Sequence, residues 1–489
     1  MGLINASFLF KMTRSILNKS NLATSLSARA PFSQWRQTNS HEYTRPVDPL
    51  GKYADTFCIG GGPPGYRNLD ILAGLKLDFD QDPASLAGIV QETWKNLRFQ
   101  HPLLAATYDG DNFIYQSPGN EEELQQWADE TFLVKKSRST PTSCPEDVMV
   151  IDRCDHPMMA YIPEDKRVVF RMPHVYADGI GTAILSQDFM VELGRLMSAT
   201  TRSDRERPFR EDIQNLPLGT CVAANMPELS AEWQESVRAK LPDPKTDEAI
   251  RMPTKDDAGS NILPRDTRMQ RLRFTKTETA NILARARKSG LKLAPFIHAT
   301  MLHAAKKLAI TPEQETKNHT SFMLFNLRDR CHGTPANAAH RALDYRVAFW
   351  YSQIQLGNNL YDTASALKDH YESILQEKES RAAAHIPHCE KMTPFLGDNV
   401  QHSIMISSIG NLDPIIPEKK CGALKLDEFS VTALVTSPLL FVPVQTFAGQ
   451  LEVRITYNEA YHEDSQVAEL LQLLREEVGP ACFFGELVV

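Results

Sequence analysis

The chain has 489 residues, of which 42% are hydrophobic and 23% charged, so it is long enough for two or three compact units with their own cores. Its formal net charge of -8 lacks the basic excess of nucleic-acid-binding proteins, and no apolar run reaches the ~18 residues of a membrane span. The eight cysteines form no Cys-x-x-Cys pair, which favours reduced structural thiols in an intracellular protein over a catalytic cysteine or a metal site.

The N-terminal segment has a composition of its own. Residues 1–40 contain five lysines and arginines and no acidic residue, which is typical of a mitochondrial presequence. A disordered extension has the same composition and is the favoured interpretation. We therefore assign residues 1–44 to an N-terminal extension and expect a cytoplasmic protein, with a mitochondrial location as the alternative.

Residues 45–215 are expected to form an N-terminal unit of strands and helices. Alternation at 75–79 predicts a strand, and an apolar face over 82–98 predicts the helix that follows it. A second apolar strand is predicted at 168–172 and ends at Pro173, which lacks a backbone donor. A helix with a buried leucine and phenylalanine stripe is expected to begin near residue 181.

Six prolines among mixed charges predict a linker over residues 216–268, because such a density of proline prevents long helices and strand pairing. The C-terminal unit, residues 269–489, has the same mixture of elements as the N-terminal one. Strands are predicted at 272–274, 322–327, 404–408, 440–447 and 451–457, and helices at 277–290, 295–307, 360–378 and 464–477. Two similar mixed halves indicate an α/β or α+β protein.

The pattern His174-x-x-x-Asp178-Gly179 carries the strongest chemical signal. In a chain of this composition, chance gives roughly 0.04 such matches. The histidine directly follows an apolar strand, where a side chain is held rigidly. A neutral imidazole with a pKa near 6.5 suits removal of a hydroxyl proton during acyl transfer from a thioester.

The other two motif residues have more than one interpretation. Asp178 could orient His174 as in a catalytic triad, or turn away into a buried ion pair that fixes the loop. Gly179 permits a tight turn from strand to helix. The structural alternative is a buried histidine followed by an aspartate that only caps the next helix.

The motif after a strand resembles the signature of the CoA-dependent acyltransferase superfamily, which includes chloramphenicol acetyltransferases, plant BAHD acyltransferases and peptide-synthetase condensation domains. Further segments resemble that family in the same chain order, and the resemblance covers about residues 45–480. They are His101–Leu104, Leu293–Ala299, Asn326–Arg330 and Gly449–Asn458. Within the superfamily the chain is most similar to fungal O-acyltransferases of the trichothecene 15-O-acetyltransferase type.

The resemblance implies an α/β fold of two similar chloramphenicol-acetyltransferase-like subdomains, each a mixed β-sheet with flanking helices. It places His174 in a tunnel at their interface, with acyl-CoA entering from one end and the acceptor from the other. It also implies that Asp178 points away from the histidine and pairs with an arginine of the second subdomain. Arg328 matches that arginine best, and Arg330 is the alternative.

One segment departs from the family pattern. Plant members carry Asp-Phe-Gly-Trp-Gly late in the chain, whereas this chain has Asp427–Ser430 without the glycines, so their CoA contacts do not transfer. Shortly before it, a hydroxyl of Ser407 or Ser408 could stabilise a developing oxyanion, although an ordinary strand end explains these serines too.

Two weaker signals concern bound groups. Lys288 and Lys292 belong to a basic cluster that could contact the CoA phosphates, or could simply form a solvated helix face. His385-x-x-His388 has metal-ligand residue types, but its setting favours a loop, and we expect no metal site.

The sequence thus predicts an acyl-CoA-dependent O-acyltransferase that moves an acyl group, expected to be acetyl, to a hydroxyl of a small secondary metabolite such as a trichothecene-like terpenoid. Acyl-CoA is expected as a co-substrate, with no tightly bound cofactor, and the protein as a monomer. A condensation-type or N-acyltransferase, using an amine acceptor or a carrier-protein thioester, is the enzymatic alternative. A catalytically inactive binding protein is the non-enzymatic one.

Overall fold

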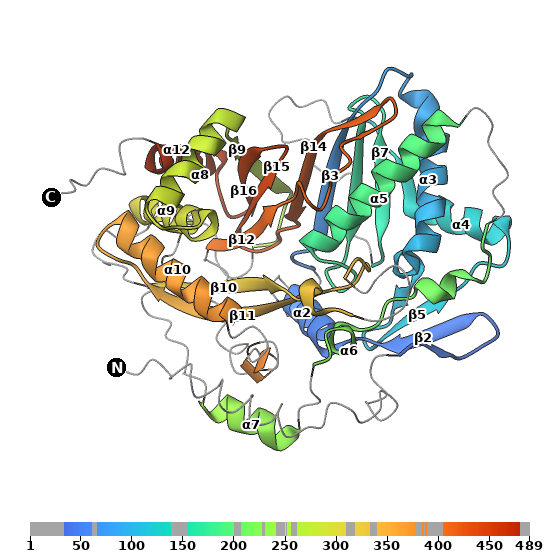
Figure 1. Ribbon diagram of the computed structural model, residues 1–489, viewed down its shortest axis with the longest axis horizontal. Helices are drawn as coiled ribbons and strands as arrows, with labels where there is room; N and C mark the ends of the chain where they lie inside the picture. The colour runs from blue at the N-terminus through green and yellow to red at the C-terminus, as the bar shows by residue number, and fades with distance from the viewer. Residues whose placement is uncertain are drawn as a thin grey trace.

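The computed structural model of the chain shows two mixed α/β halves side by side, each with a sheet covered by helices (Figure 1). The α/β class and the two-part organisation expected from the sequence are confirmed. The structure describes residues 34–60, 66–137, 155–199, 207–226, 230–240, 250, 252–255, 262–309, 318–332, 340–376, 381, 384–385, 387–388 and 404–479. The presequence-like part of the extension, up to residue 33, lies outside these residues.

The N-terminal half is built on a six-stranded sheet of order β13-β14-β3-β8-β7-β6. Helices α3 and α5 pack against each other and cover one face of this sheet, where Phe170 contacts the rings of Trp94 and Phe189. The bounds are β3 Ile71–Asp78, α3 Ala87–Gln100, α4 Glu121–Thr131, β6 Phe132–Val134, β7 Met158–Ile162, β8 Arg167–Met172 and α5 Gly179–Ser198.

A small second sheet of order β1-β2-β5-β4 adjoins the N-terminal half. Its strands are β1 Arg36–Gln37, β2 Glu42–Pro46, β4 Thr107–Tyr108 and β5 Asn112–Gln116. Because β2 pairs along its whole length with β5, residues 36–44 belong to the folded unit and not to the expected extension. β1 and β2 consist mostly of polar and charged residues, so no apolar alternation marks them in the sequence.

The C-terminal half combines a four-stranded sheet of order β12-β15-β16-β9 with the hairpin-like pair β10-β11. The strands are β9 Thr267–Arg273, β10 Asn318–Asn326, β11 Val347–Gln355, β12 Ile404–Asn411, β15 Leu440–Phe447 and β16 Gln450–Asn458. The helices are α8 Lys276–Lys288, α9 Leu293–Leu308, α10 Leu360–Gln376 and α12 Asp464–Val478. A capping box between Thr275 and Glu278 starts α8, and Gly290 adopts φ +67° just beyond its end.

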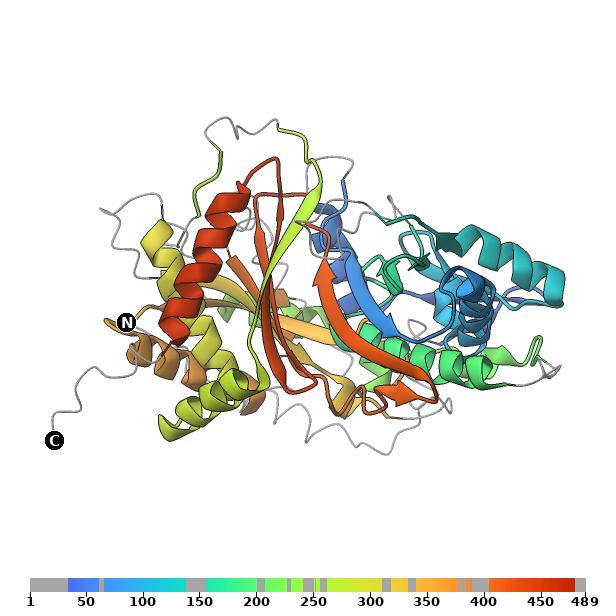
Figure 2. The ribbon, with the colours of Figure 1, turned by 90° about the horizontal axis from the view of Figure 1, so that it is seen from above.

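One strand crosses between the halves. β14, Leu424–Ala433, follows β12 in the chain but pairs antiparallel with β3, with Phe429 opposite Leu75; the short β13, Lys420–Cys421, extends that edge. Figure 2 shows β14, in orange, beside β3, in blue, at the centre of the molecule. The N-terminal sheet is therefore incomplete without residues from the C-terminal half.

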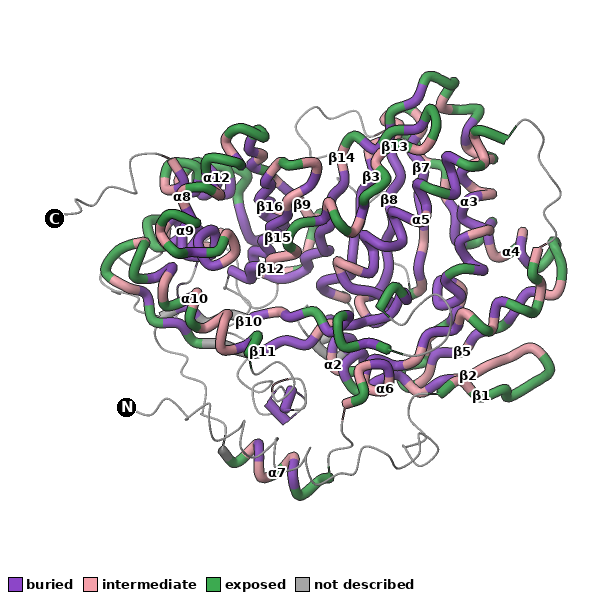
Figure 3. The backbone as a smooth tube through the Cα atoms, viewed as in Figure 1, coloured by how far each residue is buried: buried purple, intermediate pink, exposed green. Residues whose placement is uncertain are grey.

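Some of the described helices lie away from the two large sheets (Figure 1). They are α2 Pro49–Gly60, α6 Thr220–Ala223 and α7 Ala231–Lys240, the last two within the proline-rich segment. The strands of both halves are mostly buried, and exposure concentrates on the outer helix faces and loops (Figure 3). Among the described residues, no helix is both long and apolar enough to cross a membrane.

Candidate active site

His174 follows β8 and Pro173 and lies in the turn that leads into α5. Its Nδ1 lies 2.8 Å from the carbonyl oxygen of Ala177. Since a carbonyl oxygen only accepts hydrogen bonds, Nδ1 carries the proton in this contact. The neutral ring therefore keeps its lone pair on Nε2, the nitrogen available to a substrate.

The surroundings of His174 keep the imidazole uncharged. Burial lowers the pKa of His174 below its usual value, while the hydrogen bond to Ala177 and the charges of Asp178 and Asp70 oppose that shift. The net direction is downward, so the ring is a ready proton acceptor at neutral pH.

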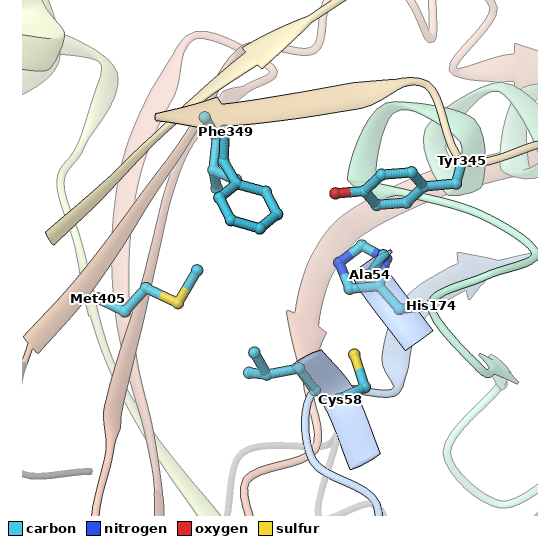
Figure 4. A pocket seen from close by; sticks show the side chains of 8 residues that line it. Ala54, Cys58, His174, Tyr345, Phe349 and Met405 are labelled. Carbon is cyan, nitrogen blue, oxygen red and sulfur yellow. The ribbon is translucent and has the colours of Figure 1, made fainter. Parts of the chain in front are cut away.

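A small pocket adjoins His174. Both halves line it: α2, the segment before β3 and the His174 turn on one side, and β10, β11 and β12 on the other. The lining residues are Ala54, Cys58, Leu69, His174, Leu324, Tyr345, Phe349 and Met405. Figure 4 shows Tyr345 next to His174 with its hydroxyl directed into the pocket, Phe349 and Met405 on the β11 and β12 side, and Cys58 below. None of these residues carries a formal charge when the histidine is neutral.

Asp178 faces away from the imidazole. Its side chain caps α5 by accepting a hydrogen bond of 2.9 Å from the backbone of Gly181. Nη1 of Arg328 lies 2.7 Å from both carboxylate oxygens, and Asp178 and Arg328 are both buried. Burial opposes ionisation of Asp178, but the charge and hydrogen bonds of Arg328 outweigh it and keep the pKa of Asp178 below its usual value. Arg330, the alternative partner, is exposed.

The ion pair extends into a buried charge network. Asp344 pairs with Arg45 at 3.3 Å and lies 4.0 Å from Arg346. The backbone N–H of Arg346 donates to Asp178 at 2.8 Å, and Arg328 Nη2 donates to the carbonyl of Asp344. Segments 150 or more residues apart are thus joined through Asp178 and Asp344.

The two glycines of the turn have different roles. Gly179 does not adopt a positive φ, so the backbone freedom expected for it is not what the turn requires. A Cβ there would lie 3.3 Å from Cγ1 of Val431 on β14, so close packing explains this glycine. At Gly181 a Cβ would lie only 2.9 Å from Nη2 of Arg328, which makes Gly181 the position that admits the guanidinium.

The two candidate serines lie on opposite faces of β12. Ser408 is paired with Val444, which belongs to the C-terminal core under the helices. Ser407 shares the other face with Met405, which lines the His174 pocket. Alternation along the strand therefore favours Ser407 over Ser408 as a group near the reacting atoms.

The other sequence candidates lie apart from this pocket. Lys288 and Lys292 are exposed, and Lys292 forms an ion pair of 3.5 Å with Glu372. His385 bonds the backbone of Phe349, and His388 stacks on Trp350. Within the described part of the chain, no group of three or more His, Cys, Asp or Glu residues has the arrangement of a metal site.

The fold and the sequence have known relatives. The structure is similar to that of TRI3, the trichothecene 15-O-acetyltransferase of Fusarium sporotrichioides, with a TM-score of 0.72 and 15% identity over 92% of this chain and 98% of that one. No protein-family model matches the chain.

Two curated proteins from Monascus ruber align with most of the sequence. O-acetyltransferase pigM is 23% identical over 450 residues, covering 89% of this chain and 85% of its own length. Acetyltransferase pigO is 21% identical over 457 residues, covering 90% and 96%. These similarities identify the chain as an acyltransferase.

Sequence reasoning did not find most of the pocket of this acyltransferase. Tyr345, Phe349 and Met405 come from segments that carry no motif, and Cys58 was one of eight scattered cysteines. Burial raises the pKa of the Cys58 thiol, so it contributes a neutral wall to the acyltransferase pocket.

Proposed function

We propose that the acyltransferase moves an acyl group, acetyl in the simplest case, from acyl-CoA to a hydroxyl group of a small secondary metabolite, with His174 as the general base. One observation carries the proposal: Nδ1 of His174 is bonded to its own loop, which leaves the basic Nε2 at a pocket lined by both halves. Acyl-CoA acts here as a free co-substrate.

The reaction needs no covalent enzyme intermediate. Nε2 of His174 takes the hydroxyl proton as the acceptor oxygen bonds to the thioester carbonyl carbon, giving a tetrahedral intermediate and an imidazolium. Collapse breaks the carbon–sulfur bond, and the CoA thiolate takes the proton from the imidazolium. The products are an ester and free CoA, and His174 is neutral again. In this proposal the hydroxyl of Ser407 donates a hydrogen bond to the oxyanion.

The pocket lining bears on the class of acceptor. It offers apolar side chains, a neutral thiol and a tyrosine, and among the described residues it includes no carboxylate to pair with a cationic amine. Burying an unpaired ammonium is costly, so an uncharged alcohol fits better. Similarity to two acetyltransferases in sequence and to trichothecene 15-O-acetyltransferase in fold supports acetyl-CoA as the donor, and a hydroxylated terpenoid is the proposed acceptor class.

A thiol-release assay tests this function. Purified protein is incubated with acetyl-CoA and a panel of hydroxylated terpenoids, simple alcohols and amines, and free CoA and acylated product are measured together. Ester formation that disappears in His174→Ala is the expected result. Amide products from the amines would instead support an N-acyltransferase. Turnover only with a pantetheine thioester would support a condensation-type enzyme, and no turnover with any donor would support an inactive binding protein.

A further inference from the structure

Tyr345 contacts the proposed base directly. Its ring meets the imidazole of His174 edge-on, with ring centroids 5.2 Å apart and an interplanar angle of 78°. Tyr345 is 3% exposed and precedes β11, in the C-terminal half, whereas His174 belongs to the N-terminal half. Edge-to-face contact is a favoured aromatic geometry, and it leaves one edge of the imidazole to face the pocket (Figure 4).

The backbone of Tyr345 is held on both sides by the charge network. The preceding Asp344 accepts a hydrogen bond of 3.0 Å from the N–H of Tyr345. The N–H of the following Arg346 donates to Asp178 at 2.8 Å. The carbonyl of Tyr345 accepts from the hydroxyl of Thr220 at 2.6 Å. A three-residue segment from the second half is thus anchored to the carboxylate of the motif.

These contacts form a closed loop around the base. His174 is bonded to Ala177, Asp178 follows Ala177 in the chain, and Asp178 anchors the segment whose ring packs on His174. The imidazole is therefore fixed by its own turn at Nδ1 and by the opposite half at its ring. Such double fixing is what holds a catalytic group within the small tolerance that chemistry requires.

We infer that Tyr345 is a positioning residue for His174, and that the Asp178 network serves to hold the Tyr345 ring against the imidazole across the interface of the two halves. The inference rests on the proposed role of His174 as base. It gives Asp178 an effect on the rate that acts through Tyr345 and not through contact with the imidazole.

Removal of the ring should change the environment of His174. The titratable groups near it are Cys58 on α2 and Tyr345, which line the same pocket, and Asp178 and Asp70, whose charges act on the imidazole although Asp178 faces away from it. Replacing the ring by a smaller side chain admits water beside the imidazole, which favours the charged form. The pKa of His174 then rises toward 6.5, and the acid limb of the rate profile moves to higher pH.

Three variants separate this role from a general packing role. Tyr345→Leu removes the ring, Tyr345→Phe keeps it, and Phe349→Leu removes another ring of the same pocket, one that packs on Tyr53 and His385. Kinetics use acetyl-CoA and a terpenoid alcohol that the wild type acetylates. Histidine-ring NMR reports the His174 titration without any acceptor, with His174→Ala assigning the signal.

Tyr345→Leu should lower kcat roughly 10- to 100-fold with little change in KM, because misplacement of a catalytic group by about 1 Å has effects of that size. It should also raise the His174 pKa, and Tyr345→Phe should restore both. Phe349→Leu should change KM and leave the His174 titration in place. Should leucine unfold the protein, Tyr345→Met replaces it.

Two results would overturn the inference. One is a wild-type kcat together with a wild-type His174 titration in Tyr345→Leu, and the other is a change in the His174 pKa in Phe349→Leu as large as that in Tyr345→Leu. Failure of the proposed function can be told apart from these results, because His174→Ala would then retain the wild-type rate regardless of the effect of the Tyr345 variants. The NMR titration also remains informative if no acceptor is acetylated.

Discussion

His174 and Asp178 lie four residues apart in sequence and face opposite ways in the structure. The imidazole faces a pocket without charged lining, whereas the carboxylate lies 2.7 Å from the guanidinium of Arg328. A direct Asp–His contact would raise the pKa of the histidine. Turning Asp178 toward the arginine leaves burial as the leading influence on His174, and its pKa moves down.

Asp178→Ala should cost stability as well as rate. It leaves Arg328 buried without its carboxylate, and breaking a buried pair in this way costs about 3–5 kcal/mol. Urea unfolding measures the change. Lys292→Ala, which breaks the exposed pair with Glu372, is the control and should change stability by less than about 1 kcal/mol. A stable Asp178→Ala protein with only a rate defect would show that the ion pair does not support the fold.

Gly181→Ala should destabilise the protein although alanine is the better helix former. The added methyl group would lie 2.9 Å from Nη2 of Arg328, and overpacking of this kind costs about 1–3 kcal/mol. Gly88→Ala is the matched control on α3, where a Cβ meets no atom within 4 Å and the helix gains about 0.5–1 kcal/mol. Thermal unfolding should show a lower midpoint for Gly181→Ala and a higher one for Gly88→Ala. Shifts of the midpoint in the same direction would contradict the prediction.

At the scale of elements, one glutamine joins the two large sheets. Gln445 on β15 donates to the carbonyl of Phe429 at 2.7 Å and accepts from the N–H of Val431 at 3.3 Å, both on the free edge of β14. Its side chain therefore takes the place of a neighbouring strand. This contact holds β14 beside β15. Because β14 belongs to the N-terminal sheet and β15 to the C-terminal sheet, it joins the two sheets.

Gln445→Leu should loosen that junction. It leaves two buried backbone groups without these partners, each costing about 1–3 kcal/mol. Hydrogen exchange at the β14 amides and urea unfolding give the readout. Gln355→Leu, at an exposed position of β11, is the control and should leave both unchanged. Equal protection of the β14 amides in the two variants would argue against the bridging role.

Elements with strong local patterns could be predicted from the sequence, and their partners could not. In the predicted α5 stripe, Leu185, Phe189 and Leu193 are buried, whereas Leu196 at its end is only partly buried. β14 carries no local sign that it pairs with β3, more than 340 residues earlier in the chain, because alternation specifies a strand but not its neighbour. Ala448 and Gly449 connect β15 and β16, and the positive φ at both residues suits a tight hairpin.

At the scale of the whole molecule, the pocket exists only where the halves meet. The motif located its base in sequence, since His174 needs one strand, one proline and one helix start. The opposite wall, Tyr345, Phe349 and Met405, depends on how β11 and β12 approach α2, which no local pattern specifies. The acyltransferase activity and the proposed base His174 could therefore be predicted from the sequence, whereas the residues of the opposite pocket wall could not.

The buried histidines of the C-terminal half predict loss of stability in mild acid. Burial lowers the pKa of His319 to about 3 and that of His385 to about 4, and both are almost fully buried. In the unfolded chain both titrate near 6.5. Above that pH neither state is protonated, so the histidines add no pH dependence. Below it the unfolded state binds protons that the folded state refuses until about pH 4, and stability falls by about 1.4 kcal/mol per pH unit for each group.

His319→Phe isolates this effect from the carboxylates, which titrate at lower pH. The ring that meets His298 at 5.3 Å is kept and the titrating nitrogens are removed. Nε2 of His319 has no hydrogen-bond partner among the residues that the structure describes, so an apolar ring loses little there. Urea unfolding between pH 8 and pH 5 should give parallel curves above pH 7 and a slope smaller by about 1.4 kcal/mol per pH unit below 6.5. Identical slopes in that window would mean that the folded protein accepts a proton at His319 as readily as the unfolded chain does.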